Sequence, residues 1–115
     1  MKLPNGSRAV VDIEKLRDYC LSAVHPEGRH KARVFLSTLG ITSEDAGKFR
    51  EILISAAARN DEIAMTGADK YGCRYSFDLM ITWGSREAQV RSAWIIKAGE
   101  DVPRLVSCYV LRGGS

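Results

Sequence analysis

The chain has 115 residues, a formal net charge of +3 and an apolar fraction of 45%. This length suits one domain with a single hydrophobic core, and this composition excludes a largely disordered chain. No stretch approaches the ~18 apolar residues of a membrane span, and the N-terminus lacks the apolar run of a signal peptide. We therefore expect one cytoplasmic domain over residues 1–115, or the same domain delivered to a target-cell cytoplasm within a larger effector. Its ordered core is expected at about 3–111, with Gly113–Ser115 a frayed end or linker.

Helical periodicity dominates the first half of the chain. It predicts a helix capped by Asp12 and ending before His25, a second at 29–39 stopped by Gly40, and a third from Thr42 or Ser43 to about Arg59. The predicted apolar faces are Ile13, Leu16, Cys20 and Val24 in the first helix; Ala32, Phe35, Leu36 and Leu39 in the second; and Ala46, Phe49, Leu53 and Ala56 in the third.

From about residue 61 the apolar period changes from 3.6 to 2, which indicates strands. The predicted strands cover 63–66, 74–83, 88–97 and 104–111, with turn residues around 67–72, 84–87 and 99–103. The order of elements predicts an α+β domain, in which three N-terminal helices pack on a three- to four-stranded antiparallel sheet.

The three cysteines, Cys20, Cys73 and Cys108, have no paired spacing and are odd in number. We therefore expect buried free thiols rather than a disulfide framework or a zinc site, and no metal or cofactor.

The segment 25–31 contains both histidines, together with Arg29 and Lys31, where the second helix begins. Imidazole titrates near neutral pH, and cations beside a helix N-terminus suit a phosphate. The segment therefore predicts a phosphate-handling site, the alternative being a solvated polar turn between two helices.

The sequence lacks the motifs of several classes of enzyme. The sequence has no G-x-S-x-G elbow and no glycine-rich phosphate loop. Metal-free acid–base chemistry on a phosphodiester remains. RNA can be cleaved by attack of its own 2′-hydroxyl, so that the protein supplies only a base, an acid and positive charge.

Two groups of residues resemble a known family. The first is Lys15-Leu16-x-x-Tyr19-x-Leu21, followed by His25-Pro26-x-Gly28-x-x-Lys31-Ala32-x-x-Phe35-x-x-x-Leu39-Gly40; the second is Tyr71-Gly72-x-Arg74-Tyr75, Ser92-x-Trp94 and Pro103–Ser107. Together they resemble a bacterial domain family of unknown function that occurs alone and at the C-termini of polymorphic or contact-dependent toxins. The layout is similar to the barnase/EndoU/colicin/RelE group of metal-independent ribonucleases. The family usually has Thr where this chain has Ser107.

The resemblance implies a small endoribonuclease-like toxin domain, with RNA as substrate and an acidic immunity or antitoxin protein as partner. It implies catalytic roles for His25, His30, Lys31, Arg74 and Ser107, and substrate-binding roles for Arg29, Ser92, Trp94 and Arg104. His25 or His30 would act as base or acid, Lys31 and Arg74 would stabilise the phosphate, and Ser107 would orient it. The alternatives are a non-catalytic basic module that binds nucleic acid or an acidic protein, and a structural protein without a site. The oligomeric state stays open.

Overall fold

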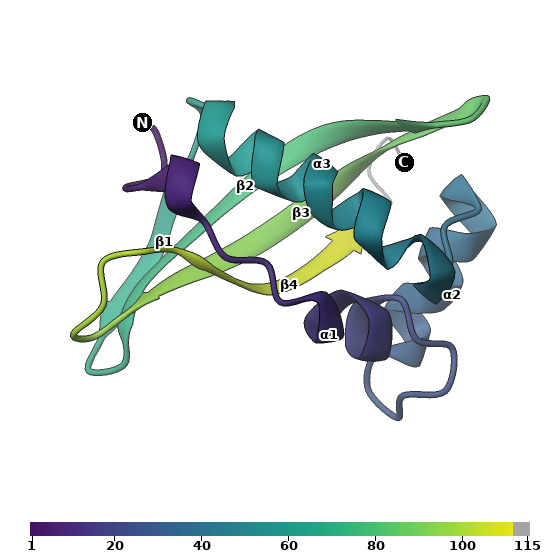
Figure 1. Cartoon of the computed structure of the whole chain (residues 1–115), viewed down its shortest axis with the longest axis horizontal. Coiled ribbons are helices and arrows are strands. Elements are labelled where there is room, and N and C mark those ends of the chain that lie inside the picture. The colour runs from purple at the N-terminus through teal and green to yellow at the C-terminus, as the bar shows by residue number, and fades with distance from the viewer. Residues whose placement is uncertain (112–115) are drawn as a thin grey trace.

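A computed structural model describes residues 1–111, and Figure 1 shows the helical elements followed by the sheet. The elements are the 3-10 turn η1 (Gly6–Arg8), α1 (Ile13–Lys15), the π-turn η2 (Leu16–Cys20), α2 (Arg29–Leu39), the 3-10 turn η3 (Ser43–Asp45), α3 (Ala46–Arg59), β1 (Ala64–Asp69), β2 (Gly72–Trp83), β3 (Arg86–Lys97) and β4 (Arg104–Val110). The expected α+β class is confirmed. Gly113–Ser115 lie outside the described residues. None of the helices within residues 1–111 is both long and apolar enough to cross a bilayer.

The sheet is an antiparallel meander of four strands in the order β1-β2-β3-β4. The hairpin of β2 and β3 is its longest pairing, running in register from Gly72 opposite Lys97 to Trp83 opposite Arg86. Gly84, with φ of 63°, supplies the positive φ that a two-residue hairpin turn needs. Register shifts mark a bulge at Thr66 in β1 and another at Val106 in β4. The second bulge lets both Leu105 and Cys108 point into the core.

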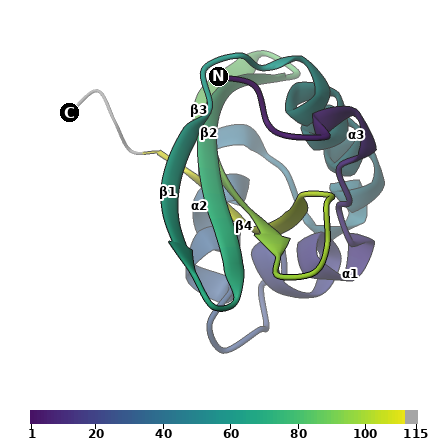
Figure 2. The same cartoon turned by 90° about the vertical axis from the view of Figure 1, so that its left-hand side faces the viewer.

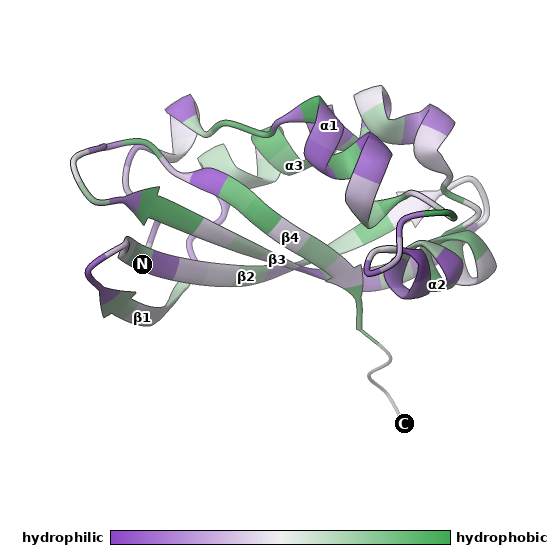
Figure 3. Ribbon diagram, turned by 90° about the horizontal axis from the view of Figure 1, so that it is seen from below, coloured by the Kyte–Doolittle hydropathy of each residue, from purple (hydrophilic) through white to green (hydrophobic). Residues whose placement is uncertain are grey.

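The two faces of the sheet differ in what covers them. Figures 1 and 2 show α3 and α1 on one side of the sheet, and Figure 3 shows α2 at its far end, beside the C-terminal end of β4. The covered face is apolar, and residues 93, 107 and 109 lie on the opposite face by strand register. The core-facing side chains include Tyr75, Phe77, Ile81, Val90, Trp94 and Leu105, which join Phe35, Phe49 and Leu53 of the helices in one hydrophobic core.

The helix from 29 to 39 is confirmed, with Gly40 in the left-handed conformation after it. The third helix is also confirmed, because Thr42 and Asp45 form a capping box ahead of α3. In the second and third helices, two expected core positions differ from the structure: Leu36 is 52% exposed, and Ala56 is only partly buried, whereas Ala57 is buried in its place. Leu36 is exposed because its side of α2 borders an open hollow rather than the sheet.

The first predicted helix differs most from the structure. Asp12 caps it as expected, but α1 has only one turn and continues as η2, whose last bond runs from Leu21 N–H to Leu16 C=O. This wider turn leaves Leu21 buried, and the chain then departs from the helix axis. Val24, expected on the apolar face, is therefore 87% exposed in the following loop.

Candidate functional site

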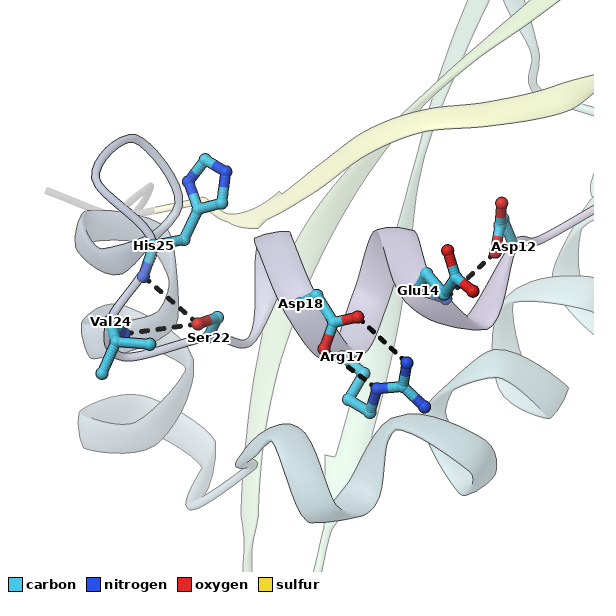
Figure 4. A network of polar contacts seen from close by, with 7 residues as sticks. All are labelled: Asp12, Glu14, Arg17, Asp18, Ser22, Val24 and His25. Atoms are coloured by element: carbon cyan, nitrogen blue, oxygen red, sulfur yellow. Dashed lines mark hydrogen bonds and ion pairs between the residues drawn. The ribbon is translucent and has the colours of Figure 1, made fainter.

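The loop between η2 and α2 is built around Ser22 and His25. Ser22 Oγ accepts hydrogen bonds from the backbone N–H groups of Val24 and His25, as Figure 4 shows. His25 Nδ1 then accepts from the N–H groups of Glu27 and Gly28, at 3.0 and 2.9 Å. Because two donors point at Nδ1, the proton of the neutral imidazole lies on Nε2. The loop therefore holds His25 as an Nε2–H donor.

Gly28 fastens this loop to η2. A Cβ atom at Gly28 would overlap the carbonyl group of Tyr19, so only glycine allows this close approach. The Tyr19 ring meets the His25 ring edge-on, with centroids 4.8 Å apart and an interplanar angle of 87°. Tyr19 thus contacts the loop through both its backbone and its ring.

Lys31, in the first turns of α2, joins η2 to β4. Its Nζ lies 2.8 Å from Ser107 Oγ and 3.5 Å from Tyr19 Oη. The same ammonium group lies 5.2 Å from the ring centroid of Tyr19 and 5.7 Å from that of Tyr109. We call these four residues, together with His25, the Lys31 cluster.

No carboxylate of residues 1–111 lies within ion-pair distance of Lys31. A buried or half-buried cation normally has an anionic partner, because desolvation is otherwise costly. Lys31 is half-buried and has only hydroxyl groups and aromatic faces around it. It therefore has unused capacity to bind an anion.

The arginines on the sheet face opposite the helices differ from Lys31, because each of the three described below is paired with a carboxylate. Arg74 pairs with Asp69 at 2.6 Å, and Arg104 pairs with Glu100 at 3.0 Å. Arg91 makes two bonds to Asp78, at 2.8 and 3.0 Å. The bond from the Tyr71 N–H, and after it Arg74, holds the pKa of Asp69 below its ordinary value. These carboxylates neutralise the three arginines.

Two hollows flank the Lys31 cluster. One, of about 310 Å³, is lined by His30, Lys31, Val34, Tyr109 and Val110, and we call it the α2–β4 hollow. The other is lined by Tyr19, His25 and Lys15, together with the three acidic residues drawn in Figure 4, which are Asp12, Glu14 and Asp18. The lining of the α2–β4 hollow contains no carboxylate, so a phosphate that approaches Lys31 from this side meets no like charge there.

The expected site residues fall into three groups. His25, Lys31 and Ser107 meet in the Lys31 cluster, and His30 lines the adjoining hollow. Arg74 lies on β2, two strands from Ser107, which corresponds to about 10 Å across a sheet. Arg104 and Arg29 line other hollows, Arg104 near the start of β4 and Arg29 on the other side of α2.

Ser92 and Trp94, expected to bind substrate, lie in the core instead. They are 0% and 1% exposed. Ser92 Oγ donates to the Phe77 carbonyl at 3.1 Å and accepts from Trp94 Nε1 at 2.9 Å. Successive side chains of β3 point to opposite faces of the sheet, and those of Ser92 and Trp94 point toward the helices. Their polar atoms are already satisfied within the protein.

Sequence reasoning missed Tyr19 and Tyr109 as members of the site. Tyr19 belongs to the motif that precedes His25, but the sequence alone assigns it no role in the site. Tyr109 lies two residues after Ser107, and this spacing places both on the same face of β4. The period-2 pattern was therefore the signal that could have identified Tyr109. Within residues 1–111, His, Cys, Asp and Glu side chains do not gather in a group of three or more that could hold a metal ion.

The sequence matches the family model described as "Domain of unknown function (DUF6883)" over residues 2–112, and the chain therefore belongs to this family. None of the curated proteins matches it. The fold is similar to one chain of the "Contact-dependent growth inhibition toxin - immunity protein complex from Klebsiella pneumoniae 342". The TM-score is 0.71 at 15% sequence identity, over 89% of this chain and 99% of that chain. At this identity the likeness establishes a shared fold.

Proposed function

We propose that this chain is the effector domain of a bacterial toxin–immunity pair and cleaves RNA without a metal ion. The observation that carries the proposal is the Lys31 ammonium group, held by Ser107 and Tyr19 with no carboxylate partner among residues 1–111 and two imidazoles nearby. The shared fold with a chain of a toxin–immunity complex supports the same function. A cation, hydroxyl groups and imidazoles are the groups that this reaction needs.

The reaction begins with attack of the substrate 2′-hydroxyl on its neighbouring phosphate. His30 is the exposed imidazole beside the α2–β4 hollow, and it removes the 2′ proton. His25 is not the base, because the loop keeps its Nε2 protonated and its Nδ1 engaged. It donates its Nε2–H to a phosphate oxygen instead.

Charge develops on the phosphate oxygens as the fifth bond forms, and Lys31 lies where it stabilises that charge. Ser107 Oγ accepts the bond from Lys31 and keeps its own proton for a phosphate oxygen. Tyr19 Oη also accepts from Lys31, so its proton is free for the leaving 5′-oxygen. The base removes one proton and the acid returns one, and the products are a 2′,3′-cyclic phosphate and a 5′-hydroxyl.

The α2–β4 hollow has the composition of a nucleotide site. Val34, Tyr109 and Val110 give it an apolar surface and one aromatic ring, and Lys31 and His30 lie on it as well. A base packs on such a surface while its phosphate reaches the cation. This arrangement supports an unpaired nucleotide as the substrate rather than a duplex.

The net charge of +3 supports an acidic inhibitor as the partner. The paired arginines of the sheet weaken the alternative of a basic binding module without activity, because their charge is already neutralised.

The proposal is tested by incubating the purified chain with total bacterial RNA in excess EDTA. We expect discrete RNA fragments that increase with time. Unchanged RNA at high protein concentration, with a folded protein, would reject the activity. Salt-sensitive RNA binding without fragments would favour the binding module.

A further inference from the structure

Two cysteine thiols lie directly behind the Lys31 cluster and have no part in the proposed reaction. Cys20 follows Tyr19 at the end of η2, and Cys108 follows Ser107 on β4. Both are 0% exposed and belong to the same core. The third cysteine, Cys73, is partly exposed on β2, where it pairs with Ala68 and Ile96.

The packing holds the two thiol-bearing segments together from both sides. On the outer side, Lys31 bonds to Tyr19 and to Ser107, the residues that precede the two cysteines. On the inner side, η2 packs against β4, and both cysteines are buried in the same hydrophobic core. The two cysteines therefore lie on neighbouring segments that Lys31 holds together.

The two thiols differ in pKa, and this difference identifies which of them acts as the nucleophile. The interaction with Cys108 lowers the pKa of Cys20 to about 7 in spite of burial, and the charge of Lys31 acts in the same direction. The interaction with Cys20, followed by burial, raises the pKa of Cys108 well above its ordinary value. Cys20 is therefore the thiol that ionises first and attacks first.

We propose that Cys20 and Cys108 form a dithiol–disulfide site that links η2 to β4 beneath the Lys31 cluster, with a small disulfide such as oxidised glutathione as the oxidant. The Cys20 thiolate attacks one sulfur of oxidised glutathione, breaks its S–S bond and releases one glutathione. The Cys108 thiol then gives up its proton and attacks the Cys20 sulfur of the mixed disulfide, releasing the second glutathione. The protein loses two hydrogen atoms and two electrons, and one oxidised glutathione becomes two reduced glutathiones.

The disulfide fixes the distance between the backbone segments that carry Tyr19 and Ser107, the two oxygen partners of Lys31. Its formation does not depend on RNA cleavage, so the two proposals fail independently. Because both thiols are buried, the oxidant reacts during folding or when the loop after η2 opens locally.

The test is refolding of the full chain in a glutathione redox buffer, with refolding in dithiothreitol as the reference. Free thiols are then alkylated in denaturant, and the protein is measured by intact mass and by peptide mapping. We expect loss of two hydrogen masses, a peptide pair joining Cys20 to Cys108, alkylated Cys73, and reversal by dithiothreitol. The linked form should melt several degrees higher, because the link restricts the unfolded chain.

Cys73→Ser is the matched variant and should form the link as the natural chain does. The wild-type mass decides the question even if Cys20→Ser or Cys108→Ser fails to fold. Refolded protein in which Cys20 and Cys108 are both alkylated, or in which glutathione is attached to Cys73 alone, would overturn the proposal.

Discussion

Lys31 Nζ and Ser107 Oγ lie 2.8 Å apart although 76 positions separate them in the chain. This contact joins the first turns of α2 to the outward face of β4. It forms because the bulge at Val106 changes the phase of β4, so that Ser107 faces Lys31 while Cys108 enters the core. The contact defines the position of the candidate site.

The Ser107 hydroxyl is expected to matter for cleavage rather than for folding. Ser107→Ala should lower the rate of RNA cleavage by about 10-fold or more, because the hydroxyl no longer positions Lys31 or donates to the phosphate. Ser107→Thr retains the hydroxyl, and it should keep the rate within about threefold of the wild type. Cleavage rates on one RNA oligonucleotide measure both effects. The comparison requires that both variants and the wild type have the same melting temperature, so that folding does not account for a difference. Equal rates for the two variants would remove Ser107 from the site.

His25 has two separable roles. His25→Asn keeps an acceptor where Nδ1 receives the Glu27 and Gly28 N–H groups, but it removes the Nε2–H donor. We expect the free energy of unfolding of this variant to lie within about 0.5 kcal/mol of the wild-type value. We expect its cleavage rate to be about 100-fold lower.

His25→Ala removes the acceptor as well, and it should also cost about 1–2 kcal/mol of stability. Urea unfolding and cleavage rates on the same samples measure the two roles. An active His25→Asn variant would show that the imidazole serves only the loop.

Gly28 should tolerate no side chain, because a Cβ atom there meets the Tyr19 carbonyl group. Gly28→Ala should cost about 1–3 kcal/mol by forcing the loop away from η2, and it should weaken cleavage by displacing His25. Gly47→Ala is the control, since Gly47 is exposed in α3 with no heavy atom within 4 Å of its added Cβ. It should be neutral or stabilise by up to about 1 kcal/mol. Equal effects of the two changes would contradict the close contact.

Ser92 is expected to stabilise the core without taking part in cleavage. Ser92→Ala leaves the buried Trp94 Nε1–H without its acceptor and should cost about 1–3 kcal/mol. Ser76→Ala, at a half-buried position on the other face, should stay within about 0.5 kcal/mol of the wild type. Thermal unfolding measures both changes. A folded Ser92→Ala variant that has lost cleavage would restore the substrate-binding role predicted from the sequence.

Local signals made much of this fold predictable. Gly40 and the Thr42–Asp45 capping box mark helix ends through their own chemistry, and the alternation in β2 and β3 assigns each residue to a face. The π-turn was not predictable, because the apolar spacing of Leu16 and Cys20 fits an ordinary helix as well. The exposure of Val24 follows from that turn.

The site was predictable only in part, for a similar reason. The segment from His25 to Lys31 is local in sequence, so its residue types were sufficient to indicate it. The pairing of Arg91 with Asp78 depends on the register of β2 and β3, which no local pattern encodes. Arg74 and Arg104 pair with carboxylates only five and four positions away, across the turns that precede their strands. Ser92 shares its face of β3 with Val90 and Trp94, so its burial was predictable from the alternation of apolar and polar residues.

In the proposed reaction, Lys31 stabilises the phosphate during RNA cleavage. Lys31→Met keeps the aliphatic stem and removes the charge, and Lys48→Met is its control, because Lys48 lies over the Trp83 ring at 4.6 Å, outside the cluster. The deciding measurement is the yield of fragments with 2′,3′-cyclic phosphate ends, made from one RNA in EDTA. We expect such ends from the wild type and from Lys48→Met, and a loss of about 100-fold or more for folded Lys31→Met. Equal yields from all three proteins would contradict this role of Lys31.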